Sequence, residues 1–129
     1  MTLRPATPKD ERRLWCWRNH PSARAASVQS DLIPWETHRK WFRTHSHHIW
    51  IIMQGRVACG VIREEDCHQV SIFIDPRFRG RGVSAAALIQ FGQPGLLACI
   101  RSDNSASQRA FVGAGYKRLE GQWLWYRKQ

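Results

Sequence analysis

The sequence predicts an α/β protein of the α+β type, and two observations support this prediction. Short apolar runs rich in β-branched residues alternate with runs whose composition favours helices. The chain is 129 residues long and 43% hydrophobic, which is sufficient for one domain with its own core. No linker, repeat or low-complexity tract interrupts it, so we expect a single domain over residues 1–129.

The N-terminal half is expected to contain one strand, two helices and then three further strands. The first strand should cover residues 2–6, and the first helix residues 10–20, with Pro8 and Asp10 as start signals. A second helix is predicted over residues 35–44. The later strands are predicted at residues 49–54, 57–63 and 67–75, the first two joined by a turn at Gln54-Gly55-Arg56.

The C-terminal half is expected to alternate helices and strands. A helix at residues 83–90 should end early, because Gly92, Pro94 and Gly95 follow it. The remaining elements are predicted as a strand at residues 96–100, a helix that begins at Asn104, and strands at residues 117–120 and 123–127.

The most informative segment runs from Val70 to Ser84, where an apolar strand leads directly into a glycine-bearing turn and then a helix. Gly80 and Gly82 allow the backbone to curl so that N–H groups point inward, and the helix adds the partial positive charge of its N-terminus. Such a turn is suited to bind an anion. A P-loop needs a Lys-Ser or Lys-Thr pair where Val83-Ser84 stands, and a dinucleotide fingerprint also fits poorly.

A second motif begins at Asn104 and ends at Tyr116. Asn104 can cap a helix and Gly115 can end it, so the spacing also has a purely structural interpretation. An aromatic residue, Phe111, lies seven positions after Asn104.

The two motifs, in this order and with a strand between them, resemble the signatures of the GCN5-related N-acetyltransferase (GNAT) family. Arg77, Gly80 and Gly82 match the pattern of its acetyl-CoA loop. The resemblance implies a GNAT fold: a mixed, mostly antiparallel central sheet flanked by helices, with acetyl-CoA held where two neighbouring strands splay. The residues that it implies for acetyl-CoA binding are Phe73, Ile74, Arg77, Arg79, Gly80, Arg81, Gly82, Val83, Ser84, Asn104, Ser107 and Phe111.

Residues 15–21, 33–42 and 69–74 look most like the branch that acetylates nucleotide-linked amino sugars, including the pseudaminic-acid-pathway N-acetyltransferases. That similarity implies a cleft that recognises a sugar and its phosphates with polar and aromatic side chains, namely Arg18, Asn19, His38 and Trp41. Helix-cap roles for the polar residues remain an alternative. Core packing is the alternative for the aromatic residues Trp15, Trp17, Trp41 and Phe42, and we prefer it for Trp15 and Phe42.

The formal net charge of +10 suits anionic ligands, because a positive cleft attracts both coenzyme A and a sugar nucleotide. We therefore expect an acetyl-CoA-dependent N-acetyltransferase with a small-molecule acceptor, a sugar nucleotide, in a monomer or homodimer. The alternatives are a protein or peptide N-terminal acetyltransferase, and a catalytically silent binder of acetyl-CoA or polyanions. A specific nucleic-acid partner is disfavoured, because the basic residues are spread along the chain and are densest on the cofactor loop.

Acetyl transfer to an amine needs a base, a stabilised oxyanion and a leaving thiolate. A backbone N–H of the strand ending Ile72-Phe73-Ile74 could stabilise the oxyanion where the sheet splays. The branch that acetylates ribosomal protein N-termini has a Glu base and a Tyr acid at the positions held here by Cys99 and Phe111. Their absence disfavours that substrate class. Thiolate departure without a strong acid is tolerable, because a coenzyme A thiol should have a pKa near about 8.5.

A base must therefore come from elsewhere, and the candidate catalytic residues are Glu65, Gln69 and Ser71, the last two acting through ordered water. Glu64, Asp66 and His38 remain alternatives.

The cysteines Cys16, Cys59, Cys67 and Cys99 have no paired spacing and are interpreted as buried free thiols. The histidines His45, His47 and His48 have no partner at ligand spacing, so no metal is expected. The chain shows no signal peptide and no apolar run approaching a membrane span, which predicts a cytoplasmic protein without a membrane partner.

Overall fold

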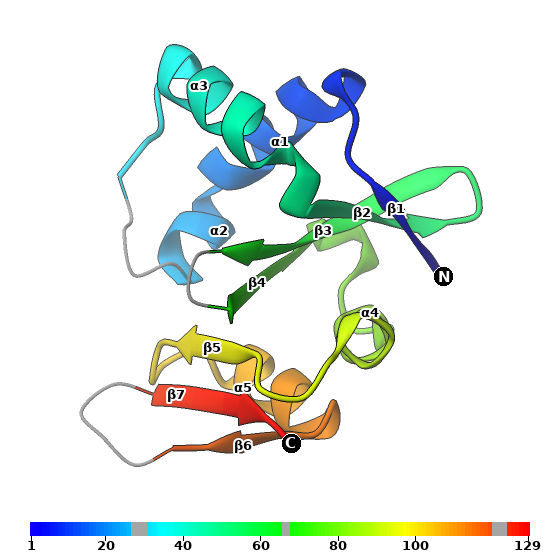
Figure 1. Ribbon diagram of the computed structural model, residues 1–129, viewed down its shortest axis with the longest axis vertical. Coiled ribbons are helices and arrows are strands. Elements are labelled where there is room, and N and C mark those ends of the chain that lie inside the picture. The colour runs from blue at the N-terminus through cyan, green and yellow to red at the C-terminus, as the bar shows by residue number, and fades with distance from the viewer. Residues whose placement is uncertain (27–30, 66–67, 120–123) are drawn as a thin grey trace.

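The computed structural model describes residues 1–26, 31–65, 68–119 and 124–129, and within them seven strands form one sheet in the order β1-β2-β3-β4-β5-β7-β6 (Figure 1). Neighbouring strands are antiparallel except β4 and β5, which are parallel. The predicted mixed, mostly antiparallel sheet flanked by helices is thereby confirmed.

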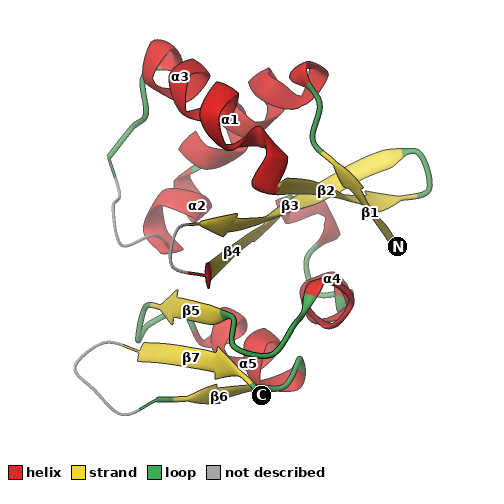
Figure 2. Cartoon of the chain, viewed as in Figure 1, coloured by secondary structure: helices red, strands yellow, loops and turns green. Residues whose placement is uncertain are grey.

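Figure 2 distinguishes the helices, strands and loops of the chain by colour. The strands are β1 Thr2–Pro5, β2 Ile49–Gln54, β3 Val57–Glu65, β4 Gln69–Ile74, β5 Leu97–Ile100, β6 Tyr116–Arg118 and β7 Leu124–Lys128. The helices are α1 Glu11–Asn19, α2 Pro21–Ala26, α3 Trp35–His45, α4 Val83–Phe91 and α5 Ser105–Gly113, with 3₁₀ turns at Pro8–Asp10, Ser46–His48 and Pro76–Phe78.

Two hydrophobic cores lie on opposite faces of the sheet, because successive side chains of a strand point to opposite sides. On β2, Ile51 packs with Leu14 of α1 and Phe42 of α3. The neighbouring Ile52 packs in the other core, which also contains Leu88 of α4 and Phe111 of α5. Helices α1 and α3 therefore cover one face, and α4 and α5 cover the other.

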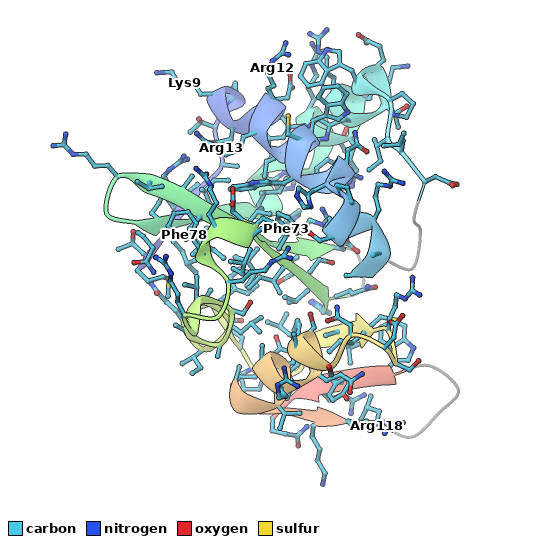
Figure 3. All side chains as sticks on the ribbon, turned by 180° about the vertical axis from the view of Figure 1, so that it is seen from behind. Lys9, Arg12, Arg13, Phe73, Phe78 and Arg118 are labelled. Atoms are coloured by element: carbon cyan, nitrogen blue, oxygen red, sulfur yellow. The ribbon has the colours of Figure 1, made fainter. Side chains whose placement is uncertain are left out.

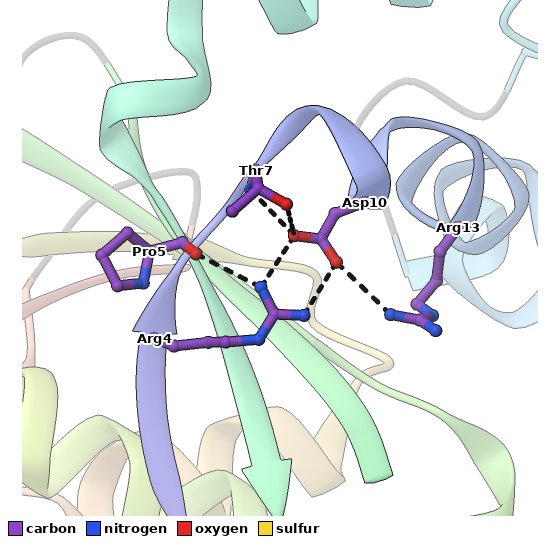
Figure 4. Close-up of polar contacts among 5 residues, drawn as sticks. All are labelled: Arg4, Pro5, Thr7, Asp10 and Arg13. Atoms are coloured by element: carbon purple, nitrogen blue, oxygen red, sulfur yellow. Dashed lines mark hydrogen bonds and ion pairs between the residues drawn. The ribbon is translucent and has the colours of Figure 1, made fainter. Parts of the chain in front are cut away.

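Asp10, which is buried, fastens β1 to the start of α1 (Figure 4). The Arg4 guanidinium donates to both carboxylate oxygens, at 2.8 and 2.9 Å, and the Thr7 N–H donates at 2.8 Å. Arg13 adds a third cationic contact at 3.3 Å. Burial favours the neutral acid, but the hydrogen bonds from Arg4 and Thr7 outweigh it and lower the pKa of Asp10.

Most predicted elements agree with the structure to within one or two residues, but helix α2 was not predicted. The strand predicted at 67–75 begins at Gln69, and residues 66 and 67 lie outside the described residues, as do the Glu120 and Trp123 ends of the last predicted strands. Cys59 is buried as expected, whereas Cys16 is exposed, so the expectation that it is buried was wrong.

Strands β4 and β5 are registered at one residue pair, Gln69 with Leu97. In the described part of the chain, the rest of β4 pairs with β3 alone. The central sheet thus opens between two parallel strands, as the predicted splay requires.

Candidate functional site

A cavity of about 530 Å³ lies at this opening. Its lining residues come from α1, α2, residues 31–37, β3, β4, β5 and α5. Among the predicted site residues it brings together Arg18, Glu65, Gln69, Ser71, Phe73, Asn104, Ser107 and Phe111. It does not include Asn19, His38 or Trp41, nor the residues of the loop after β4.

The free edge of β4 carries backbone groups that face the opening. The Asp75 N–H donates to the Cys59 carbonyl of β3 at 2.8 Å. Because N–H directions alternate along a strand, the Phe73 N–H also faces β3, and the N–H groups of Ile72 and Ile74 face the opening. The expected oxyanion donor on this strand is therefore at Ile72 or Ile74, while the Phe73 side chain packs near Trp17.

The loop between β4 and α4 has the conformation that its glycines were predicted to allow. Gly80 and Gly82 have φ values of 77° and 73°, and Gly82 is the N-cap residue of α4. A Cβ at either position would meet nothing within 4 Å, so the loop borders open space. No side chain caps α4, and the first N–H groups of a helix have no acceptor within it. The loop thus fits the phosphates of acetyl-CoA.

The loop arginines lie in three different environments. The two phenylalanines whose rings they approach, Phe73 and Phe78, are labelled in Figure 3. Arg77 turns back onto Asp75. Arg79 donates to the Ile74 carbonyl at 3.0 Å and to the Ser22 hydroxyl of α2 at 2.9 Å. Arg81 is exposed and its guanidinium lies 5.6 Å from the Phe78 ring centroid. After them, the Val83 side chain belongs to the core and Ser84 is half-buried, so Val83 faces the loop through its backbone.

Asp75 joins this loop to α1. Its carboxylate accepts from the backbone N–H and guanidinium of Arg77, at 3.0 to 3.2 Å, and from the Trp17 indole N–H at 3.2 Å. The Arg77 side chain is the largest cause that lowers the pKa of Asp75, to about 2. Asp75 is thus ionised over the physiological range and orients the start of the loop.

The second motif has the predicted helix cap. The Asn104 side chain accepts from the Ser107 N–H at 3.2 Å, so its amide oxygen is used within α5. Phe111 is buried edge-on against Tyr116, with ring centroids 4.8 Å apart. Burial raises the pKa of Tyr116 to about 12.

The candidate catalytic residues form a polar cluster across β3 and β4. Glu65 is paired with Gln69 in the sheet. Its carboxylate accepts from Arg63 Nε at 2.8 Å and from the Ser71 hydroxyl at 3.4 Å. Asp66 lies outside the described residues. Glu65, Gln69 and Ser71 therefore share one wall of the cavity.

The residues predicted to bind the acceptor do not lie together in the structure. Arg18 lines the cavity, whereas His38 is fully buried behind it. The Asn19 side chain bonds the backbone N–H and carbonyl of Ile33 at 2.7 and 2.9 Å, and so holds the segment before α3. Trp41 borders an adjoining cavity of about 340 Å³.

Two contributors to the site were not predicted: Arg63, and Trp17 as a donor to Asp75. Arg63 borders both cavities and lies 5.2 Å from the Trp41 ring centroid. The signal that could have found it is its position on the strand face that also carries Glu65, two residues later.

No cluster of three His, Cys, Asp or Glu side chains suited to a metal ion occurs in the described residues. Across the same residues, no helix is long and apolar enough to span a membrane.

A family description, acetyltransferase (GNAT) domain, matches residues 1–117. A search of curated proteins finds no match. Among solved structures, a Salmonella typhimurium protein described as an acetyltransferase with its cofactor acetyl-CoA is 20% identical, with a TM-score of 0.76, over 98% of this chain and 90% of that chain. Spermidine N-acetyltransferase from Vibrio cholerae, in complex with CoA and spermine, is 13% identical, with a TM-score of 0.78 over 98% and 92%.

Ribosomal-protein-alanine N-acetyltransferase from Brucella melitensis is 19% identical, with a TM-score of 0.71 over 98% of this chain and 96% of that chain. At these identities the structures share the fold alone, and their acceptors differ. The family match covers most of the chain, and the loop and splayed strands fit an acetyl-CoA site. The chain therefore belongs to the GNAT family of acetyl-CoA-dependent acetyltransferases.

Proposed function

We propose that this acetyltransferase moves the acetyl group of acetyl-CoA to the primary amine of a nucleotide-linked amino sugar. The observation that most supports this acceptor is the Arg18 guanidinium on the cavity wall, which no ion pair found among the described residues includes. Arginine binds phosphate oxygens well, and a pyrophosphate would give Arg18 an anionic partner. Arg63, on the same wall, is already paired with Glu65 at 2.8 Å.

The chain offers two sets of groups to acetyl-CoA. The backbone of residues 80–84 would hold its phosphates, and the Ile72 and Ile74 N–H groups would meet its acetyl end. Acetyl-CoA supplies a thioester whose carbonyl carbon is attacked by the amine. An N–H fixed in a strand stabilises the oxyanion without reorganising, which is the basis of its catalytic effect.

The proton of the acceptor's ammonium would leave through Ser71 to Glu65. The Ser71 hydroxyl already donates to the Glu65 carboxylate, so it can accept a proton from the amine side while passing its own on. Arg63 holds the carboxylate in place through Nε. Gln69, beside them, would orient the amine or a water.

Phe111 offers no proton to the departing thiolate. We propose that departure needs no acid, because a thiol with a pKa near about 8.5 leaves as the anion at modest cost.

The test is thiol release from acetyl-CoA with a panel of amines: UDP-linked amino sugars, the same amino sugars without the nucleotide, N-terminal peptides and polyamines. We expect kcat/KM to be at least about a hundredfold higher with the nucleotide-linked sugar, which corresponds to about 2.7 kcal/mol. Arg18→Gln should reduce that preference. Equal or better turnover of peptides or polyamines would refute the sugar-nucleotide acceptor.

A further inference from the structure

Arg18 of α1 is a cation on the cavity wall. Its guanidinium lies 4.0 Å from the Trp41 ring centroid, and burial followed by the charge of Arg63 lowers its pKa to about 10, while the charge of Glu65 acts in the opposite direction. No ion pair found among the described residues includes Arg18. A cation in this position, on a cavity wall, is ready for an anionic group of the ligand.

The side chain that fixes Arg18 is His38 of α3, and the chemistry of its neighbours defines its tautomer. The Glu11 carbonyl oxygen lies 2.7 Å from Nε2 and can only accept, so Nε2 carries the proton. The Arg18 Nη1 lies 3.1 Å from Nδ1 and can only donate, so Nδ1 must be the acceptor. His38 therefore holds Arg18 only while it is neutral.

The surroundings of His38 oppose a second proton. The imidazole is fully buried, beside the aromatic rings of α3 itself, and burial is the largest cause that lowers its pKa. The hydrogen bond to Glu11 and the charge of that residue oppose the shift, whereas Arg18 from α1 and Arg63 from β3 add to it. Neutral His38 is thus the stable form down to mildly acidic pH.

We propose that His38 is a positioning residue that holds Arg18 ready for an anionic group of the acceptor, and that protonation of His38 releases Arg18 and weakens acceptor binding. This inference rests on the proposed function, since it takes that group to be the pyrophosphate of a sugar nucleotide. A proton on Nδ1 would bring two N–H donors and two like charges within hydrogen-bond distance. Arg18 would then move away, and the advantage of its fixed geometry would be lost.

The test uses UDP-N-acetylglucosamine as the probe, because its pyrophosphate diester does not titrate in the range of interest and it has no free amine. Calorimetry on the full chain should show its affinity level between about pH 8 and about pH 6.5 and falling several-fold as the pH drops to about 5, because the lowered pKa of His38 places its titration below the ordinary range of a histidine. His38→Gln keeps an acceptor and a donor but cannot titrate, so its affinity should stay level over this range. His48→Gln, in an exposed 3₁₀ turn, is the matched control and should keep the wild-type profile.

The possible outcomes are distinguishable. Wild-type affinity that is independent of pH, or a drop that persists in His38→Gln, would overturn the role of His38 while leaving the proposed acceptor intact. No binding of the probe by the wild type at about pH 7.5 would overturn the sugar-nucleotide acceptor, and the role of His38 in binding it.

A second measurement does not depend on any acceptor or on a variant at His38. Nuclear magnetic resonance of the imidazole nitrogens should show the Nε2–H tautomer at neutral pH. Arg18→Gln removes a nearby positive charge, so it should raise the pKa of His38. An Nδ1–H tautomer, or a pKa unchanged by Arg18→Gln, would overturn the proposal.

Discussion

Asp75→Asn should destabilise the folded protein and disturb the loop that follows β4. Asparagine keeps the size of the side chain but replaces one carboxylate oxygen by an N–H₂ group. In place of Oδ2 that group would face the Trp17 indole N–H and Arg77 Nη2, and in place of Oδ1 it would face the backbone N–H and Nε of Arg77, all of which are donors. The substitution therefore removes a charge and leaves a buried donor without an acceptor.

The size of the effect follows from the pKa of Asp75, which falls from its ordinary 3.8 to about 2. At about 1.4 kcal/mol for each pKa unit this corresponds to about 2.5 kcal/mol. Most of the Arg77 side chain is exposed, so solvent screening reduces the expected loss to about 1–2 kcal/mol. The melting temperature should fall by about 3–6 °C.

Urea unfolding followed by circular dichroism, at several pH values, tests this reasoning. Because the pKa of Asp75 is lower in the folded protein, its contribution is complete above about pH 4 and is lost as the pH falls through about 2. The difference between wild type and Asp75→Asn should therefore shrink on acidification. Equal stability at pH about 7, or a difference that does not change down to pH about 3, would refute the role of the carboxylate charge.

Three further variants test the site. Gly82→Pro should abolish coenzyme A binding, because proline cannot adopt a φ of 73° and removes an N–H, whereas Arg81→Ala should only weaken it; unchanged calorimetric affinity for Gly82→Pro would contradict the loop assignment. Ser71→Ala should lower kcat about tenfold, since water can partly replace the hydroxyl, and leave acetyl-CoA affinity unchanged; an unaltered kcat would remove Ser71 from the proton path to Glu65. Phe111→Tyr should not raise the rate, and a tenfold gain, about 1.4 kcal/mol of barrier, would show that a missing acid limits the enzyme.

The conformation of the loop between β4 and α4 was predictable from sequence because its determinants are local. Gly80 and Gly82 are glycines at positive φ, and Asn104 caps the helix that follows it, so each residue type directly predicts its own conformation. Helix α2 was not predicted because none of its six residues is buried, so its sequence has no apolar periodicity to detect.

The positions of the residues expected to bind the acceptor depend on packing between helices and strands, and the sequence predicted these positions less well. His38 was expected on the cleft wall, but it lies four residues before the buried Phe42 and shares the inner face of α3. That spacing is visible in the sequence and would have predicted burial. The contacts of Arg63 could not be predicted, because a charged residue near the end of a strand is usually solvated and only the position of Trp41 on α3 reveals its environment.

The single registered pair between β4 and β5 makes β4 an edge strand in the middle of the sheet. Exposed strand edges invite pairing with other chains, and proteins commonly cover or shorten them. Under the proposed function this edge cannot be covered permanently, because its N–H groups would then be unable to meet the acetyl donor. A ligand bound to the Ile72 and Ile74 N–H groups takes the place of the missing neighbour strand. The acetyl donor should therefore slow hydrogen exchange at these two amides and reduce the tendency of the protein to self-associate.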